Sequence, residues 1–500
     1  MRREVYRLHV QGADARNHLL WPLLQANLDR GAGGHAALVG ERVVSYADLT
    51  AATAAGAAEI DDRFAAGSRI LVASRNQLHV AIGLLAALGS RSVPLLVDPT
   101  SPAELRRTAK EWSVAGGIGE RSVLDATASP VFDATRIAAW LDAPTPLAGY
   151  TPRAVSEGEP AFWTFTSGTT GEPKAVVHAH RGPGAAFAAF ARGVLQLGPE
   201  DVTISTAGLP FVYALGNNFF FPLMAGGTAV LPADLLLPTV LRDLARHGAT
   251  VLVAGPRSLS ALARLVRRAR HVEAIRSLRI VLSAGEPLPG PVFCEWERRF
   301  GKQVLDNLGC TEMFNSFISG MPGRTRADSL GFAVPGFEVR IGGARAEPGA
   351  RGALAVRGES RAVAVGRSGE LRAPEGEWCE TGDEVEVDAR GAIVFLGRSD
   401  DRFKVQGQFV RPVEIERAVT EVSGVADCVA VREVDVSGLP SVVVKVVPAA
   451  GAGREDLARR VLRHARARLE RFAVPERVDL VESLPRTERG KLKRATSECS

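Results

Sequence analysis

Cysteine is scarce in this sequence, and its few cysteines are arranged neither as metal ligands nor as a disulfide framework. Cys294, Cys310, Cys379, Cys428 and Cys499 are scattered, odd in number and free of any CxxC or Cys/His spacing. The pattern excludes a zinc site of the usual spacing and a secreted disulfide scaffold. It is typical of a protein in a reducing compartment, so we expect a cytoplasmic location.

The sequence also lacks a hydrophobic run that could span a membrane and a strong charge of either sign. Its most apolar stretch, Val80 to Val97, is interrupted by Gly, Ser and Arg, and no apolar signal core opens the chain. The 61 basic and 56 acidic residues leave a net charge of only +5. This balance gives no sign of nucleic-acid binding. We therefore expect neither a membrane nor a nucleic acid as a partner, whereas a homodimer is possible.

What is present is typical of a globular protein with more than one domain. The 500 residues exceed one ordinary core, and 46% are hydrophobic while 23% are charged. Near the end, the run from Arg454 to Arg471 has apolar residues at helical spacing with arginines between them. It predicts a helix with a solvated basic face, or alternatively a surface that attracts a phosphorylated thiol.

Apolar runs and amphipathic runs alternate from Phe162 to Asn307, and more weakly over residues 40 to 140. The alternation from Phe162 to Asn307 predicts one parallel sheet covered on both faces by helices, and the weaker alternation predicts a second α/β layer. Ligands gather at the carboxyl ends of such strands. We therefore expect the loops after FWTFTS, RIVLSAG and QVLDNLG to line one crevice.

Two later regions differ in composition from this alternation. Between Gly331 and Leu396, short β runs punctuated by Gly and Pro predict a small antiparallel or barrel-like unit. A compact α+β segment follows Asp400, which we expect to act as a hinge. The predicted fold class is α/β. It has a large N-terminal domain (1–399) of two α/β sheet layers plus the small β-barrel-like unit, and a small α+β C-terminal domain (400–500).

A loop rich in glycine and hydroxyl groups, Thr166 to Lys174 (TSGTTGEPK), follows a predicted buried strand. Glycines let backbone N–H groups approach phosphate oxygens, hydroxyls add donors, and Lys174 supplies a positive charge. The order of glycines and lysine differs from GxxxxGK[ST], which argues against a P-loop NTPase. The loop therefore predicts a phosphate site of another kind.

This string resembles the phosphate loop of the adenylate-forming superfamily of acyl-CoA synthetases, peptide-synthetase adenylation domains and luciferases. Four further segments resemble family motifs in family order: GxTE at 309–312, TGD at 381–383, the hinge at 397–401 and PxTxxGKxxR at 485–494. The resemblance extends from about Leu20 to Arg494. It implies ATP, Mg²⁺ and coenzyme A as cofactors, and a C-terminal domain that moves between two reaction steps.

The resemblance also implies roles for single residues. Glu312 offers a hard carboxylate that can hold Mg²⁺, and Asp383 accepts hydrogen bonds from the ribose, although outside the family it would suit an ordinary turn. Arg398 binds the same sugar or pairs with a neighbouring acid. Lys491 bridges the attacking carboxylate and the α-phosphate. The implied catalytic residues are Lys491, Glu312, Thr166 and Lys174. The implied ATP and AMP site consists of Thr166, Ser167, Gly168, Thr169, Thr170, Gly171, Lys174, Gly285, Glu286, Pro287, Asn307, Leu308, Gly309, Cys310, Thr311, Glu312, Asp383, Arg398 and Lys491.

Leu308 stands where the family often has an aromatic residue, and Arg489 replaces a usual Ser or Thr. Aryl-CoA ligases similar to benzoate-CoA ligase also have an aliphatic residue at the first position, and the segments 209–217 and 404–416 resemble that branch. We therefore expect an aromatic or bulky cyclic acid. The implied acyl pocket consists of Tyr213, Asn217, Ala284, Gly285, Leu308 and Gly309, and the implied coenzyme A site of Gly407, Gln408 and Phe409. Tyr213 could instead serve core packing.

The implied reaction has two steps, formation of an acyl-adenylate with release of pyrophosphate, then thioester formation with release of AMP. Only six residues follow Arg494, so we expect no fused carrier domain. The acceptor is then coenzyme A or a separate phosphopantetheinyl carrier protein. A non-catalytic nucleotide-binding protein of the same fold is the alternative from another class, and a luciferase-like oxidation stays open without specific support.

Overall fold

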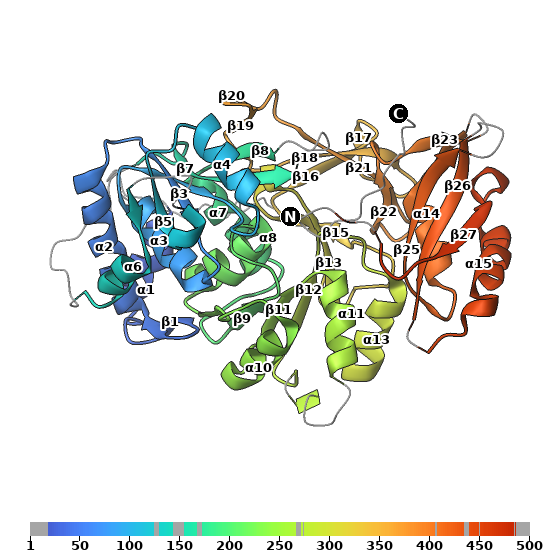
Figure 1. Ribbon diagram of the computed structural model, residues 1–500, viewed down its shortest axis with the longest axis horizontal. Helices are drawn as coiled ribbons and strands as arrows, with labels where there is room; N and C mark the ends of the chain where they lie inside the picture. The colour runs from blue at the N-terminus through green and yellow to red at the C-terminus, as the bar shows by residue number, and fades with distance from the viewer. Residues whose placement is uncertain are drawn as a thin grey trace, which may run out of the picture.

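The computed structural model describes residues 19–124, 130–143, 155–167, 173–266, 272–273, 275–405, 408–434, 440–449, 451–484 and 486. The ribbon in Figure 1 runs from a large blue-to-yellow body on the left to a smaller red unit at the right-hand end. The predicted α/β class, with a large N-terminal and a small C-terminal domain, is confirmed. Among the described helices, none combines the length and the apolarity needed to cross a membrane.

The first sheet has nine strands in the order β15-β14-β13-β12-β11-β9-β10-β1-β2. Its central strands, from β13 to β1, pair in parallel, and β14, β15 and β2 add antiparallel edges. The runs VLVA and IVLS form fully buried strands, as expected for a sheet covered on both faces. The strands are β1 (Ala36–Val39), β2 (Val43–Ser45), β9 (Val202–Ser205), β10 (Thr228–Val230), β11 (Val251–Ala254), β12 (Ile280–Ser283), β13 (Val304–Gly309), β14 (Ser316–Ser319) and β15 (Phe332–Ala333).

Helices cover both faces of this sheet. One core joins it to the outer helices α10, α11 and α13, and a larger core joins its other face to the helices that separate it from the second sheet. The outer helices are α10 (Leu237–His247), α11 (Pro256–Leu265) and α13 (Gly290–Phe300), and the inner ones include α7 (Arg181–Ala186), η2 (Phe187–Arg192), α8 (Val212–Leu215), η3 (Gly216–Phe220) and α9 (Phe221–Ala225), with η1 (Trp21–Gln25) and α1 (Ala26–Asp29) at the start of the chain.

The second sheet has eight strands in the order β20-β19-β8-β7-β4-β3-β5-β6. Helix α3 is buried at every position except His79, because it lies within the core shared by the two layers. The strands are β3 (Arg69–Ala73), β4 (Val93–Leu96), β5 (Gly116–Gly119), β6 (Val131–Phe132), β7 (Pro160–Ser167), β8 (Pro173–Ala179), β19 (Ala364–Arg367) and β20 (Glu370–Arg372), and the helices are α2 (Tyr46–Arg63), α3 (Gln77–Gly89), α4 (Pro102–Glu111), α5 (Arg121–Leu124) and α6 (Ala134–Leu141).

The alternation from Phe162 to Asn307 predicted one sheet for FWTFTS, RIVLSAG and QVLDNLG, and this was wrong. The first run is β7, which belongs to the eight-stranded sheet and pairs antiparallel with β8, whereas the other two are β12 and β13 of the nine-stranded sheet. The reason is the length of the connection. A parallel crossover needs a dozen or more residues, whereas only a short loop joins β7 to PKAVVHA, so the chain turns back as a hairpin.

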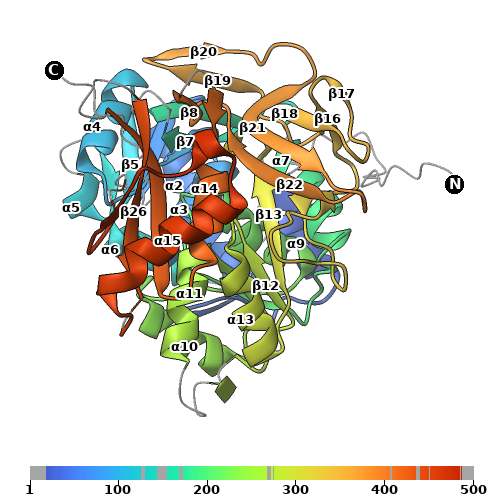
Figure 2. The ribbon, with the colours of Figure 1, turned by 90° about the vertical axis from the view of Figure 1, so that its right-hand side faces the viewer.

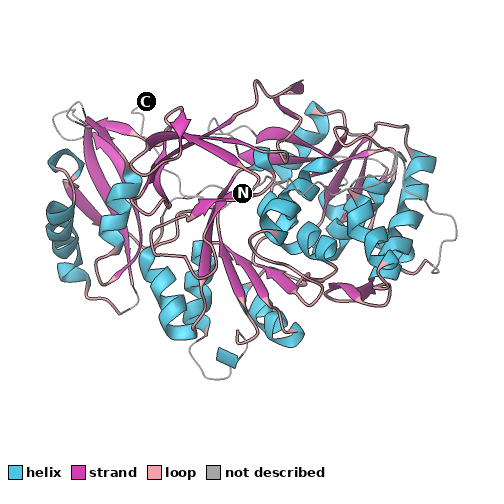
Figure 3. Ribbon diagram, turned by 180° about the vertical axis from the view of Figure 1, so that it is seen from behind, coloured by secondary structure: helices cyan, strands magenta, loops and turns pink. Residues whose placement is uncertain are grey.

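The region after β15 forms a small antiparallel sheet, as predicted, followed by the C-terminal unit. Figure 3 shows helices over the sheets of the large body and mostly strands in the segment that leads to this unit. The small sheet contains β17 (Ala344–Arg345), β16 (Glu338–Ile341), β18 (Arg351–Arg357), β21 (Cys379–Val387) and β22 (Ile393–Arg398). The C-terminal unit contains β23 (Phe403–Val405), β24 (Gln408–Val410), α14 (Pro412–Thr420), β25 (Val425–Val434), β26 (Pro440–Pro448), α15 (Arg454–Arg468), η5 (Arg471–Ala473) and β27 (Arg477–Leu480).

The C-terminal unit has its own core and touches the large body through charged side chains. Helices α14 and α15 pack on β25 and β26 around buried Val, Ile and Leu side chains, and the basic face of α15 is exposed, as predicted. Figure 2 shows this unit, with α14, α15 and β26, on the side of the molecule that faces the viewer. Arg417 of α14 donates to the Phe395 carbonyl at 2.6 Å, and Arg411 donates to Glu384 at 3.0 Å.

Candidate active site

Lys174 and Glu312 bring together two motifs that lie far apart in the sequence. In the β7–β8 hairpin, Thr166 pairs with Lys174 across the strands. The 3₁₀ helix η4 (Thr311–Met313) contacts both strands of that hairpin. The Lys174 ammonium donates to Glu312 Oε1 at 2.7 Å, and both side chains are about a quarter exposed. Strand β8, which follows the loop after β7, and η4, which follows β13, therefore meet, although β7 and β13 belong to different sheets.

The Glu312 carboxyl is charged because Lys174 outweighs the effect of burial. Burial alone raises the pKa of Glu312, but the charge and hydrogen bond of Lys174, together with the Cys310 thiol, bring it below its usual range. Among the described residues, no three His, Cys, Asp or Glu side chains cluster as a metal site. One carboxylate plus substrate phosphates is a common way for proteins to hold Mg²⁺, so Glu312 fits that ion.

The turn after Glu312 is fixed by an unusual backbone at Phe314. This residue has φ of +65°, which costs a residue with a side chain about 1–3 kcal/mol. Its ring is fully buried and packs edge-on against Phe162 and His178, and it also contacts Phe220. Aromatic packing offsets the backbone cost, so the orientation of Thr311 and Glu312 is set by the core beneath them.

Asp383 and Arg398 stand opposite one another on β21 and β22. Arg398 Nη1 donates to Asp383 Oδ1 at 3.1 Å, and Arg398 Nε donates to Asp400 Oδ1 at 3.0 Å. Of the two predicted partners of Arg398, the neighbouring acid is therefore present. Gly382 has φ of +75°, and a Cβ there would lie 2.7 Å from Arg398 Nη2. Asp400, the predicted hinge residue, is thus coupled to the Asp383 carboxylate through one guanidinium.

Asp306 is a buried acid in the middle of β13 that the sequence interpretation missed. Burial raises its pKa to about 7, against the opposing effect of hydrogen bonds from backbone N–H groups. The next residue, Asn307, donates to the Ser283 and Leu305 carbonyls at 3.2 and 2.9 Å. A polar pair directly before Leu308, at the carboxyl end of a buried strand, was the available signal.

The predicted acyl residues Tyr213 and Asn217 lie on α8 and η3 and face β13 and β14. The Tyr213 hydroxyl is buried beside Asn307 and Asp306, and burial raises the pKa of Tyr213 well above its usual value. Asn217 Nδ2 donates to Asn315 Oδ1 at 3.1 Å. The segment from Tyr213 to Asn217, which is predicted to border the acyl pocket, therefore packs beside the residues that precede and follow the GCTE motif.

The loop after β12 takes part in a row of ion-paired side chains that extends to the C-terminal unit. It begins with Ala284 and Gly285, whose φ is +92° and whose Cβ position is open, and continues with Glu286 and Pro287. Arg257 of α11 lies 3.1 Å from Glu286 and 3.8 Å from Asp427 of β25, and Arg486 lies 2.8 Å from Asp427.

Gln408 and Phe409 are exposed on the β23–β24 hairpin. Phe409 is 52% exposed. Its ring centre lies 5.0 Å from Arg402 Cζ and 4.8 Å from Lys404 Nζ. An exposed aromatic ring with two cations is a surface suited to a phosphorylated, ring-containing ligand.

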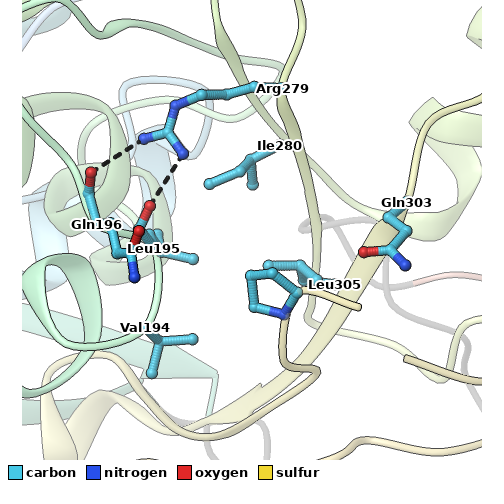
Figure 4. A pocket seen from close by; sticks show the side chains of 8 residues that line it. Val194, Leu195, Gln196, Arg279, Ile280, Gln303 and Leu305 are labelled. Carbon is cyan, nitrogen blue, oxygen red and sulfur yellow. Dashed lines mark hydrogen bonds between the residues drawn. The ribbon is translucent and has the colours of Figure 1, made fainter. Parts of the chain in front are cut away.

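A separate hollow lies at the opposite, amino-terminal edge of the nine-stranded sheet. Figure 4 shows this cavity of about 160 Å³ with Arg279 at one side. The Arg279 guanidinium is occupied by Asp201 and by the carbonyls of Leu195 and Gln196. The cavity contains none of the predicted site residues.

Several predicted site residues lie outside the described residues, and their roles stay predictions. These residues are Gly168, Thr169, Thr170, Gly171, Gly407 and Lys491. The described parts that flank them are β7 and β8, the β23–β24 hairpin, and the segment that ends at Leu484 and Arg486.

Comparison with known proteins gives consistent matches along nearly the whole chain. Residues 24–365 match the AMP-binding enzyme family and residues 414–491 match the AMP-binding enzyme C-terminal domain. The benzoate-CoA ligase of Thauera aromatica is 34% identical over 77% of this chain and 72% of its own length. The 4-hydroxybenzoate-CoA/benzoate-CoA ligase of Rhodopseudomonas palustris is 30% identical over 94% of this chain and 91% of its own length. The crystal structure of a benzoate CoA ligase from Burkholderia xenovorans superimposes with a TM-score of 0.83 at 25% identity, covering 96% of this chain and 99% of that one.

Proposed function

This chain belongs to the AMP-binding enzyme family as an AMP-forming acyl-CoA synthetase, and we propose that it converts a benzoate-class aromatic acid into its coenzyme A thioester. The observation that carries the proposal is the 2.7 Å contact between Lys174 and Glu312. This contact joins the phosphate-loop hairpin to the GCTE motif, so a nucleotide phosphate and a metal carboxylate share one site.

In the first step, the carboxylate of the acid attacks the α-phosphorus of ATP. A P–O bond forms, the bond to pyrophosphate breaks, and the product is an acyl-adenylate. Lys174 and the hairpin hydroxyls would hold the phosphates, and Glu312 would hold Mg²⁺, which would neutralise phosphate charge. Lys491 supplies a further positive charge as negative charge builds on the α-phosphate oxygens.

In the second step, the thiol of coenzyme A attacks the acyl carbon. The C–S bond forms, the bond to AMP breaks, and the thiol proton passes to solvent. The Phe409 surface, with Arg402 and Lys404 beside it, is suited to a phosphorylated thiol. Movement about Asp400 would bring this surface to the acyl-adenylate after adenylation.

Three features support an aromatic acid. The named activities of the relatives concern benzoate and hydroxybenzoate. Gly285 leaves open space where a side chain would stand, so a flat ring could lie beside that backbone. Tyr213 offers an aromatic wall with a polar end beside Asn307, which suits a ring that carries a hydroxyl or amino group.

The domain boundary at residues 399 and 400, and a homodimer, stay predictions.

A panel of acids separates the substrate classes. The enzyme is mixed with ATP, Mg²⁺ and benzoate, hydroxybenzoates, aminobenzoates, a terpenoid acid or a fatty acid, and pyrophosphate release is measured. Aromatic acids should react about tenfold faster than fatty acids. Preference for a fatty acid would reject the proposed substrate class. ATP binding without pyrophosphate release for any acid would favour the non-catalytic alternative.

The acceptor is tested in the same reaction. Coenzyme A or a phosphopantetheinylated carrier protein is added, and the products are weighed by mass spectrometry. We expect an aroyl-CoA and AMP. Acylation of the carrier alone would identify a stand-alone loading enzyme.

A further inference from the structure

A buried acid, Glu384, joins the large body to the C-terminal unit. Glu384 belongs to β21, and its side chain is only 8% exposed. Two arginines that follow Asp400 in the sequence bind its carboxylate. Arg402 Nη1 lies 2.9 Å from Oε1, and Arg411 Nε donates to Oε2 at 3.0 Å. Both carboxylate oxygens are therefore paired with the C-terminal unit.

Two arginine contacts enclose the predicted hinge residue, Asp400. Arg398 precedes it by two positions and is held by Asp383 at 3.1 Å. Arg402 follows it by two positions and is held by Glu384, the next residue of β21. A rotation about Asp400 moves the residues beyond it relative to β21, so such a rotation must break the contacts of Glu384.

Burial makes the contacts of Glu384 hard to break. A buried ion pair that loses one partner leaves a charge without compensation, whereas an exposed ion pair contributes little to stability. The nearby pair between Arg351 of β18 and Glu414 of α14 is of the second kind, because both side chains are exposed. Of these two links between the small antiparallel sheet and the C-terminal unit, the one at Glu384 therefore resists movement more.

The contacts of Glu384 fix one orientation of the C-terminal unit. In this orientation α14 packs against β22, and the Phe409 surface is open to solvent. Near the end of the chain, Arg486 pairs with Asp427, which also lies 3.8 Å from Arg257 of the large body. The unit is therefore docked through the segment that leads toward the end of the chain, as acyl-adenylate formation would require, and the Phe409 surface is left free.

Arg402 belongs both to this contact and to the Phe409 surface. While its Nη1 lies beside Glu384, its Cζ lies 5.0 Å from the centre of the Phe409 ring. A guanidinium that is paired with a carboxylate is less available to a phosphate group, because both anions use the same N–H donors. Breaking the contact with Glu384 would therefore free a cation at the surface suited to a phosphorylated thiol.

We propose that Glu384 is a positioning residue that latches the C-terminal unit in the orientation for acyl-adenylate formation, and that its separation from Arg402 and Arg411 admits the thiol. A phosphate group of coenzyme A then competes with Glu384 for Arg402. This role rests on the proposed two-step reaction, and it names the contact that controls the passage from the first step to the second.

Glu384→Gln removes the charge of the latch and keeps the size of the side chain. We expect acid-dependent pyrophosphate release to fall about fivefold and thiolysis of a supplied acyl-adenylate to rise about threefold, because the first orientation becomes less populated. The matched control is Glu386→Gln in the same strand. The Glu386 carboxylate is exposed and lies 3.8 Å from Arg351 of the large body, so both rates should stay as in the wild type.

Binding of coenzyme A tests the latch without turnover. The affinity is measured by calorimetry on the full-length enzyme in the absence of ATP and acid. Since only the unlatched state offers Arg402 to a phosphate, Glu384→Gln should bind coenzyme A about fivefold more tightly than the wild type. Arg411→Gln loosens the same contact from the C-terminal unit and should shift the affinity in the same direction, so it provides the test if Glu384→Gln does not fold.

The outcomes separate the latch from the proposed function. A residue with a purely structural role would lower both half-reactions together and would not raise an affinity. Equal falls in the two half-reactions of Glu384→Gln, or an affinity for coenzyme A equal to that of Glu386→Gln, would therefore overturn the latch. Failure of the wild type to release pyrophosphate with any acid would count against the proposed function alone, because the binding measurement needs no turnover.

Discussion

In this site, the ionisation and the orientation of single side chains depend on the charged residues next to them. Glu312 is ionised because Lys174 lies 2.7 Å away, and Lys174 in turn has a fixed direction because of that contact. Arg398 is held between Asp383 and Asp400. At this scale, a substitution that keeps shape and removes charge is the most informative change.

Glu312→Gln keeps the size of the side chain and removes the proposed metal ligand. We expect acid-dependent pyrophosphate release to fall about 100-fold or more, because the metal no longer offsets phosphate charge. Rates are measured against Mg²⁺ concentration, with the exposed Glu297→Gln of α13 as the control. An unchanged rate and Mg²⁺ dependence would show that Glu312 has no part in holding the metal.

Asp306 should make stability depend on pH. Because burial raises the pKa of Asp306 to about 7, the folded chain keeps this proton at a pH where the unfolded chain, with a pKa of about 3.9, has lost it. The contribution of Asp306 to stability therefore falls as the pH rises from about 4 to about 7, and is level above that.

Asp306→Asn cannot titrate and serves as the comparison for this effect. The wild type should lose on the order of a few kcal/mol of stability relative to this variant between about pH 4 and pH 7. Thermal unfolding midpoints of both proteins from about pH 5 upward measure most of this range. A difference between their midpoints that does not change with pH would contradict the raised pKa.

Secondary-structure elements carry these residues to one place, and glycines set how closely the elements approach. Gly382 allows β21 to turn with φ of +75° directly beside the Arg398 guanidinium. Gly309 allows β13 to approach β14, because a Cβ there would lie 2.5 Å from the Asn315 carbonyl oxygen. Both contacts are between elements, so neither is visible in the local sequence.

Gly382→Ala should weaken ATP use through Arg398. The new methyl would displace the guanidinium from Asp383, so we expect the KM for ATP to rise about fivefold or more. The matched control is Gly391→Ala in the β21–β22 turn, which has a similar φ of +79° and open space around the Cβ position. Equal effects of the two substitutions would assign the loss to backbone strain alone.

Single strands and helices could be predicted from the sequence better than the pairing and packing between them. Short apolar runs such as IVLS became buried strands, and the arginine-rich run became α15. The sheet that contains FWTFTS was not predicted, because an apolar run does not reveal which strand it pairs with. Asp306 was missed because its burial depends on Ser283 and Tyr213, which come from other elements.

At the scale of the whole molecule, the described contacts dock the C-terminal unit near the loop after β12. Arg257 of the large body lies between Glu286 and Asp427, and Asp427 also pairs with Arg486. Lys491 follows Arg486 by five positions. This docking should therefore favour the first half-reaction, in which Lys491 has its proposed role.

Asp427→Asn should slow adenylation and spare the second step. Loss of the charge weakens the contacts with Arg257 and Arg486, so we expect acid-dependent pyrophosphate release to fall about threefold to tenfold. Lys491→Ala should abolish the same step. Thiolysis of a supplied acyl-adenylate should be unchanged in both variants, and the exposed Asp456→Asn of α15 is the control. Equal loss of both half-reactions would contradict the proposed docking and the assignment of Lys491.

The central claim is that an acyl-adenylate links ATP to the thioester, and oxygen labelling tests it most directly. The wild-type enzyme is given ATP, Mg²⁺, coenzyme A and benzoate labelled with ¹⁸O in its carboxylate, and the products are analysed by mass spectrometry. Attack of the carboxylate on the α-phosphorus predicts that each AMP carries a single ¹⁸O atom and that pyrophosphate carries none. Formation of ADP with labelled inorganic phosphate, or of AMP without label, would contradict the account.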